Sequence, residues 1–317
     1  MNARRNVAAG IAALALGLAA VAPGQVALVR PKAAPEPAPR TTLRIDLNLV
    51  LVPVTVCDPL NRPVTGLEKT AFRVFDDNVE QTVTAFTQED TPVAVGLVFD
   101  TSGSMGGKLR LSRAAAAAFF QTANPEDEFS LVEFNDRPKL VVQMTGNTQE
   151  IQDHLTFSQS KGRTALLDAA ILAMHELKKS AIARKALLII SDGGDNCSRY
   201  TETELKKMVR ESDVMIYAIG IYGGGTTTEE SAGPQLLTEV AEQSGGRMLP
   251  ASPQGDDIPD IAAKIGVELR NRYMIGYSPS APHRDGRYHP VQVKIVPPRG
   301  LPALRAFWRR GYFAPSE

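Results

Sequence analysis

The sequence predicts an α/β fold: a doubly wound, mostly parallel sheet with helices on both faces, inserted in a discontinuous β-sandwich. Three observations lead to this fold class. The segment Val93 to Phe99 is apolar throughout, which is typical of a strand buried on both faces. Strand-like and helix-like segments then alternate as far as residue 269. The segments predicted within residues 43–90 and 270–317 are all strand-like.

The first β region contains three predicted strands. Leu43 to Cys57 alternates apolar with polar residues and then becomes fully apolar, as expected of a strand that passes from a half-exposed to a covered position. Phe72 to Phe75 and Gln81 to Phe86 are two shorter strands. The turn Asp76-Asp77-Asn78 between them predicts a hairpin.

The central region, residues 91–269, repeats a strand-then-helix order. Its predicted strands are Val93 to Phe99, Phe129 to Phe134, Leu140 to Met144, Ala186 to Ser191 and Val214 to Ile221. Its predicted helices run from after Lys108 to Phe120, and over Thr148 to Leu155, Ala165 to Leu177, Glu202 to Glu211, Pro234 to Gln243 and Ile258 to Leu269. This order implies parallel strands joined by helical crossovers.

The C-terminal region returns to strands separated by Pro- and Gly-rich turns. The predicted strands are Tyr273 to Tyr277, Val291 to Val296 and Leu304 to Trp308. Residues 43–90 and 270–317 are each too short to bury a core alone. We therefore expect them to pack together as one β-sandwich, with the α/β domain of residues 91–269 inserted between them.

The N-terminal segment has the features of an export signal. Arg4 and Arg5 precede the apolar run Val7 to Ala22, and small residues follow, so residues 1–24 are predicted to be a cleaved signal. An uncleaved anchor over Val7 to Val29 stays open, because that stretch approaches the length needed to span a bilayer. Residues 25–42 form a proline-rich linker. Both alternatives predict a secreted, periplasmic or cell-surface protein.

Charge and cysteine content exclude some functions and leave others open. The 317 residues contain 35 basic and 35 acidic side chains without a dense basic stripe, which argues against nucleic-acid binding. The two cysteines, Cys57 and Cys197, fall in different predicted domains. An oxidising compartment would permit a disulfide, but we expect two unpaired thiols.

Oxygen-bearing side chains follow the buried strands of the central region. In open α/β sheets, ligands bind beyond the carboxyl ends of the strands. Asp100, Ser102 and Ser104 follow the first of these strands, Thr164 precedes a predicted helix, and Asp192 follows the strand Ala186 to Ser191. These five side chains are expected to converge on one edge of the sheet.

The chemistry of this set predicts one divalent cation. Hydroxyls and carboxylates without histidine or thiolate suit Mg²⁺, Ca²⁺ or Mn²⁺, and Mg²⁺ is the expected ion. A cation held by neutral hydroxyls keeps positive charge, and the N-terminus of the following helix adds to it. The open coordination position would therefore accept a carboxylate from outside.

These motifs resemble the metal-ion-dependent adhesion site of von Willebrand factor type A domains. The resemblance rests on Asp-Thr-Ser-Gly-Ser at 100–104, on Thr164 and on Ser-Asp-Gly at 191–193, and it covers about residues 91–269. It implies that Ser102, Ser104 and Thr164 touch the metal and that Asp100 and Asp192 hold it largely through water. It also implies a non-enzymatic module that captures an exposed Asp or Glu of a protein partner. The layout as a whole resembles exported bacterial VWFA-related proteins.

Other interpretations remain beside this one. The metal site could be vestigial in a structural component of an envelope assembly. A phosphoryl-transfer enzyme with Asp100 as nucleophile is less favoured, because Ser102 stands where a second acid is expected. We expect no role for His175, His283 and His289, and a flexible connection on the ligand edge at residues 223–228.

Overall fold

The computed structural model describes residues 49–316 except 89, 223–227, 252, 253, 255, 256 and 282. The predicted signal, the proline-rich linker, the start of the first strand and most of the glycine-rich connection lie outside the described residues. Within the described residues, no helix has the length and apolar character needed to cross a membrane.

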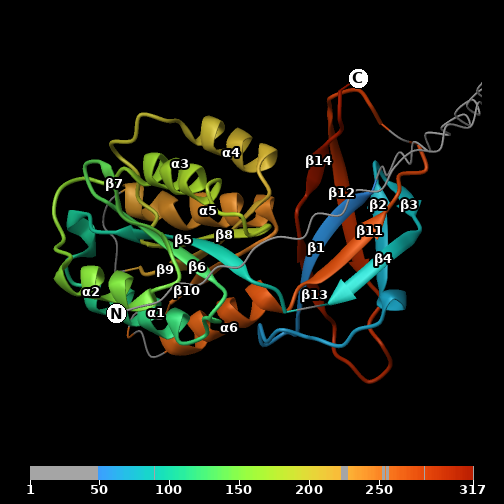
Figure 1. The fold of residues 1–317 in the computed structure, drawn as a ribbon, viewed down its shortest axis with the longest axis horizontal. Coiled ribbons are helices and arrows are strands. Elements are labelled where there is room, and N and C mark those ends of the chain that lie inside the picture. The colour runs from blue at the N-terminus through green and yellow to red at the C-terminus, as the bar shows by residue number, and fades with distance from the viewer. Residues whose placement is uncertain are drawn as a thin grey trace, which may run out of the picture. The chain divides into compact units, whose positions relative to one another are not determined.

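A six-stranded sheet forms the centre of the α/β part (Figure 1). Its strands lie in the order β10-β9-β8-β5-β6-β7, and all neighbours are parallel except β6 and β7. The bounds are β5 Val93–Asp100, β6 Glu128–Phe134, β7 Pro138–Thr145, β8 Arg184–Ser191, β9 Val214–Gly220 and β10 Met248–Pro250. Every residue of β5 is buried, as the unbroken apolar run predicts.

Helices cover both faces of this sheet. They are α1 Leu109–Phe120, α2 Thr148–Phe157, α3 Leu166–Leu177, α4 Glu202–Glu211, α5 Thr228–Ser244 and α6 Ile258–Arg270. Apolar residues of α1, α2 and α6 pack with one set of alternating strand residues, including Leu97. Those of α3, α4 and α5 pack with the other set, including Val98. Because successive strand residues point to opposite faces, two separate cores result.

Two four-stranded sheets make up the rest of the described chain. Their orders are β13-β1-β11-β4 and β14-β12-β2-β3. The bounds are β1 Val50–Cys57, β2 Phe72–Asp76, β3 Val79–Gln81, β4 Val83–Gln88, β11 Tyr273–Tyr277, β12 Tyr288–Ile295, β13 Arg305–Trp308 and β14 Gly311–Phe313. Each sheet combines strands from before and after the α/β part, and residues of both sheets, including Val54 and Val74, share one core. The predicted fold class is confirmed.

Some elements differ from the prediction. The expected strand from Gln81 to Phe86 is divided, because β3 completes the hairpin with β2 whereas β4 pairs with β11 in the other sheet. The short strands β10 and β14 were not predicted, since three residues are too few to show a period. Helix α5 begins at Thr228, before Pro234, where the sequence predicts its first residue.

The junction between α6 and the second β region is short and buried. Only Asn271 and Arg272 separate the end of α6 from β11. Near it, the buried Glu268 forms an ion pair with Arg247 and accepts a 3.6 Å hydrogen bond from the Cys57 thiol. Burial and the charge of Glu268 raise the pKa of this thiol to about 12, so it stays protonated and unreactive. Cys57 and Cys197 are both free thiols, as expected.

Candidate metal centre

The carboxyl ends of β5 and β8 lie side by side. These strands are neighbours in parallel register, with Phe99 opposite Ile190. The residues that follow, Asp100 on one strand and Ser191 on the other, therefore meet at the same edge of the sheet. This edge, at the carboxyl ends of β5 and β8, is where the sequence predicts a metal site.

Asp100 organises the loop that follows its strand. It is completely buried, and its Oδ1 accepts a 2.8 Å hydrogen bond from the backbone N–H of Ser102. Its Oδ2 accepts a 2.6 Å bond from the hydroxyl of Ser191. Burial raises the pKa of Asp100 to about 6 although these hydrogen bonds oppose the shift. A nearby cation would therefore stabilise the charged form of this carboxylate.

Two hydroxyls stand together in this loop. The Oγ atoms of Ser102 and Ser104 lie 3.1 Å apart. Ser102 is completely buried, whereas Ser104 is exposed. The pair thus extends from the protein interior to the solvent.

The Thr164 loop packs against the serine loop. The backbone N–H of Gly103 donates to the carbonyl of Gly162 at 3.0 Å, and that of Lys161 donates to the carbonyl of Thr101 at 2.9 Å. Gly162 has φ +75, a left-handed conformation that favours glycine at this point of the loop.

Thr164 itself is anchored from the β8 side. It is 5% exposed, and its N–H donates to Oδ1 of Asn196 at 2.9 Å. The N–H of Asn196 in turn donates to the carbonyl of Thr164 at 2.9 Å. Thr164 is therefore held between the two neighbouring loops.

Asp192 completes the predicted set and has a partner of its own. The side chain is buried, and the ammonium of Lys108 lies 2.9 Å from its Oδ2. The next residue, Gly193, has φ +81 and packs closely against Gly233. The loops that carry all five predicted residues are thus neighbours.

Lys108 and Tyr222 are two residues of this edge that the sequence analysis did not assign to the site. The Tyr222 hydroxyl is buried and has no hydrogen-bond partner among the described residues. Burial, together with the charge of Asp192, raises the pKa of Tyr222 to about 12. The position of Tyr222, just after β9, was a usable signal, whereas nothing in the sequence indicates that Lys108 turns toward Asp192.

The arrangement fits a hard divalent cation. Its donors are hydroxyl and carboxylate oxygens, which Mg²⁺, Ca²⁺ and Mn²⁺ prefer. Asp100 and Asp192 supply carboxylates from the protein interior, and Ser104 supplies a hydroxyl on an exposed residue. Bound there, a cation would supply a positive centre able to attract an anionic group.

A family model described as von Willebrand factor type A domain matches residues 95–194. The chain contains a von Willebrand factor type A domain. The match includes Asp100, Ser102, Ser104, Thr164 and Asp192. Domains of this family often act as adhesion or protein-binding modules, and they commonly bind a divalent cation.

Curated relatives and solved structures are similar over part of their lengths. The chain is 28% identical over 206 residues to the inter-alpha-trypsin inhibitor heavy chain H4 of Bos taurus, covering 60% of this chain and 22% of that one. The corresponding heavy chain 4 of Mus musculus is 27% identical over 222 residues, covering 64% and 23%. The chain therefore spans less than a quarter of either relative.

Among solved structures, a von Willebrand factor type A protein from Catenulispora acidiphila aligns with a TM-score of 0.49 and 13% identity, covering 77% of this chain and 73% of that one. The von Willebrand factor domain of the type V pili tip protein Mfa5 from Porphyromonas gingivalis aligns with a TM-score of 0.47 and 14% identity, covering 58% and 98%.

Proposed function

We propose that the von Willebrand factor type A domain binds a protein partner through one divalent cation, with Mg²⁺ as the first candidate. Ser102, Ser104 and Thr164 would hold the cation directly, and Asp100 and Asp192 would act mainly through water. The partner would supply the carboxylate of an exposed Asp or Glu. No step of this function requires chemistry on the ligand, so we propose a binding module and not an enzyme.

One observation carries most of the weight. The Oγ atoms of Ser102 and Ser104 lie 3.1 Å apart, the buried Asp100 accepts a hydrogen bond from the same loop, and Ser104 is an exposed residue. Neutral hydroxyl ligands would leave a bound cation with unneutralised charge facing the solvent. That charge is what would recognise an acidic side chain.

The N-terminal signature supports the cellular context of this function. A cleaved signal or an anchor would both place the domain outside the cytoplasm, where it could meet a partner. The proposed location is therefore secreted, periplasmic or cell-surface. We further propose the division into an α/β domain of residues 91–269 and β-sandwich parts of residues 43–90 and 270–317.

The test uses the purified chain and synthetic peptides that contain a single Asp, each paired with the same peptide containing Asn. The proposal expects peptides to be retained in Mg²⁺ only when they contain Asp, and to be released by a chelator. Ser104→Ala should abolish retention. Thr101→Val is the matched control, because the Thr101 hydroxyl lies in the same loop but donates to the carbonyl of Phe134 at 2.9 Å.

A structural role is the second candidate, and the contact between Lys108 and Asp192 favours it. In this alternative the ammonium neutralises Asp192, and the loops are stable without a metal. Calorimetric titration of Mg²⁺ separates the two candidates. The absence of any binding heat and of any rise in melting temperature at millimolar Mg²⁺ would favour the structural role and contradict the adhesion site.

A further inference from the structure

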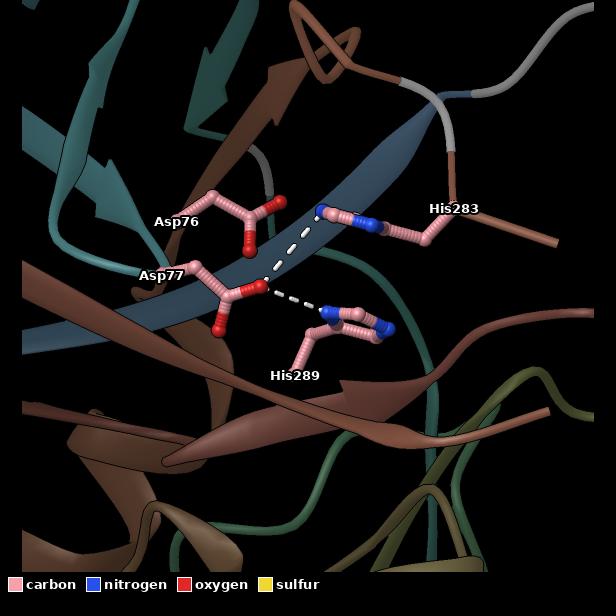
Figure 2. A group of neighbouring side chains, drawn as sticks. All are labelled: Asp76, Asp77, His283 and His289. Carbon is pink, nitrogen blue, oxygen red and sulfur yellow. Dashed lines mark hydrogen bonds and ion pairs between the residues drawn. The ribbon is translucent and has the colours of Figure 1, made fainter. Parts of the chain in front are cut away.

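A second group of metal-ligating side chains lies in the β-sandwich, apart from the von Willebrand factor type A domain. It consists of Asp76, Asp77, His283 and His289, and one ligand atom from each lies within 4.8 Å of all the others (Figure 2). Asp76 ends β2 and Asp77 begins the turn to β3, while His289 belongs to the neighbouring strand β12. His283 comes from the segment between β11 and β12.

The two histidines converge on one carboxylate oxygen. Oδ2 of Asp77 lies 2.7 Å from Nδ1 of His289 and 3.4 Å from Nε2 of His283. Figure 2 shows both rings directed at this carboxylate. The other nitrogen of His289, Nε2, lies 3.0 Å from Oδ1 of Asp285. A carboxylate on the far nitrogen is the arrangement that orients metal-binding imidazoles.

Asp76 supplies an independent observation. Its side chain is only 2% exposed, and its Oδ2 accepts hydrogen bonds from the hydroxyls of Tyr277 at 3.0 Å and Tyr312 at 2.9 Å. Its Oδ1 is buried and has no hydrogen-bond partner in the described part of the chain. Burying a carboxylate oxygen without a partner is costly, so this oxygen lacks a donor or a cation.

The donor set indicates which metal this group could hold. Two imidazole nitrogens with two carboxylate oxygens suit Zn²⁺, which binds both types of ligand and favours four-coordinate geometry. Mg²⁺ and Ca²⁺ prefer oxygen ligands alone. The group therefore differs in chemistry from the edge that carries Ser102 and Ser104.

The competing explanation is that hydrogen bonds alone hold these four side chains together, without a metal. The rings of His283 and His289 are stacked, with centroids 3.8 Å apart and 17° between their planes. Stacking of two charged imidazolium rings is electrostatically unfavourable, whereas a neutral imidazole nitrogen can bind a metal. Because a metal lies in the plane of an imidazole that binds it, the rings would have to tilt from their stack.

We propose that Asp76, Asp77, His283 and His289 bind one Zn²⁺-class transition-metal ion. The ion would fasten the turn between β2 and β3 to β12 and to the segment that carries His283. More than 200 residues separate the aspartates from the histidines in the chain. Closing so long a loop restricts the unfolded chain, so the ion would stabilise the β-sandwich.

The test is a titration of the metal-free full chain with Zn²⁺ in the presence of millimolar Mg²⁺, which would occupy the site proposed at Ser102 and Ser104. We expect one equivalent to bind and the melting temperature to rise. Co²⁺ in place of Zn²⁺ should give the visible absorption of a four-coordinate site. His283→Ala should weaken Zn²⁺ binding by at least roughly tenfold, because even the loss of an outer-sphere partner costs that much.

His175→Ala is the matched control, because His175 is an exposed histidine on α3. It should leave Zn²⁺ affinity unchanged. Circular dichroism of metal-free His283→Ala establishes that the variant folds, and Asp76→Asn, which keeps an acceptor for both tyrosines, provides a second variant. Absence of a Zn²⁺ binding step in the unaltered chain, or equal Zn²⁺ affinity in the unaltered chain and both variants, would overturn the proposal.

Discussion

Two places in this protein bring together side chains that suit metals, and they are built differently. The edge of the α/β sheet gathers hydroxyls and carboxylates from loops that each follow a strand or precede a helix. The β-sandwich group gathers two aspartates from one hairpin turn and two histidines from more than 200 residues away. The sheet-edge group follows from the repeated strand-then-helix order of the α/β part. The sandwich group depends on how two β segments that are distant in sequence pair.

The electrostatic state of the two places also differs. At the sheet edge, Asp192 has the ammonium of Lys108 as a partner. In the sandwich, Oδ1 of Asp76 has no hydrogen-bond partner among the described residues. We therefore expect a metal at the sheet edge to compete with the Lys108 ammonium for Asp192. A metal in the sandwich would instead give Oδ1 of Asp76 a partner.

The largest expected effect comes from removing both serine hydroxyls. Ser102→Ala combined with Ser104→Ala should weaken Mg²⁺ binding by at least about 100-fold, since two of the proposed direct ligands are lost. Zn²⁺ binding in excess Mg²⁺ should stay unchanged. Calorimetric titration of each metal measures both values, and a parallel loss of Zn²⁺ affinity would mean that the two places are not separate.

The reciprocal change is Asp77→Asn. Asp77 has φ +46, a conformation that asparagine tolerates, so the turn should survive the substitution. Zn²⁺ affinity should fall by roughly 10- to 100-fold because a charged ligand becomes neutral. Mg²⁺ affinity should not change, and the same titrations provide the measurement. Wild-type Zn²⁺ affinity in this variant would remove Asp77 from the proposed site.

Lys108→Met tests the competition at the sheet edge. Methionine keeps most of the apolar stem but removes the charge that lies 2.9 Å from Asp192. Mg²⁺ affinity should rise by roughly tenfold, equivalent to about 1.4 kcal/mol. A decrease would show that the ammonium supports metal binding, and that Lys108 belongs to the working site.

The smallest expected effect comes from a substitution that lowers stability at a residue of neither group, and it serves as a control for the other variants. Thr201 is the N-cap of α4 and forms a capping box, in which its hydroxyl accepts from the N–H of Glu204 and the Glu204 carboxylate accepts from the N–H of Thr201. Thr201→Ala should lower the free energy of unfolding by about 1 kcal/mol in urea titrations. Both metal affinities should be unaffected. If either one changes, lost stability alone alters metal binding, and the preceding comparisons need correction for it.

Much of the sheet-edge site could be predicted because it depends on local patterns. An apolar run such as Val93 to Phe99 reveals a buried strand, and the parallel order fixes which strand ends meet. Asp100 and Asp192 could therefore be assigned to one edge without coordinates. Lys108 could not, because the rotamer of a long side chain is decided by its surroundings and leaves no mark on the sequence.

The sandwich group could not be predicted for a different reason. The sequence predicts the turn Asp76-Asp77-Asn78, but it led us to expect no role for His283 and His289, because no periodic pattern relates the two regions. Their meeting depends on the pairing of Val291 with Asp76 between β12 and β2. The register between two strands so far apart in the chain depends on which of their faces is buried in the sandwich. No short stretch of the sequence reveals that pairing.

The short junction after α6 has a mechanical consequence. Asn271 and Arg272 together can extend by no more than about 7 Å, and they already connect the helix to β11. Sliding α6 along its axis by one turn, about 5.4 Å, would therefore pull on the central strands of a sheet or break the buried contact between Glu268 and Arg247. A force applied to the β-sandwich would therefore be transmitted directly to α6, the last helix of the α/β part.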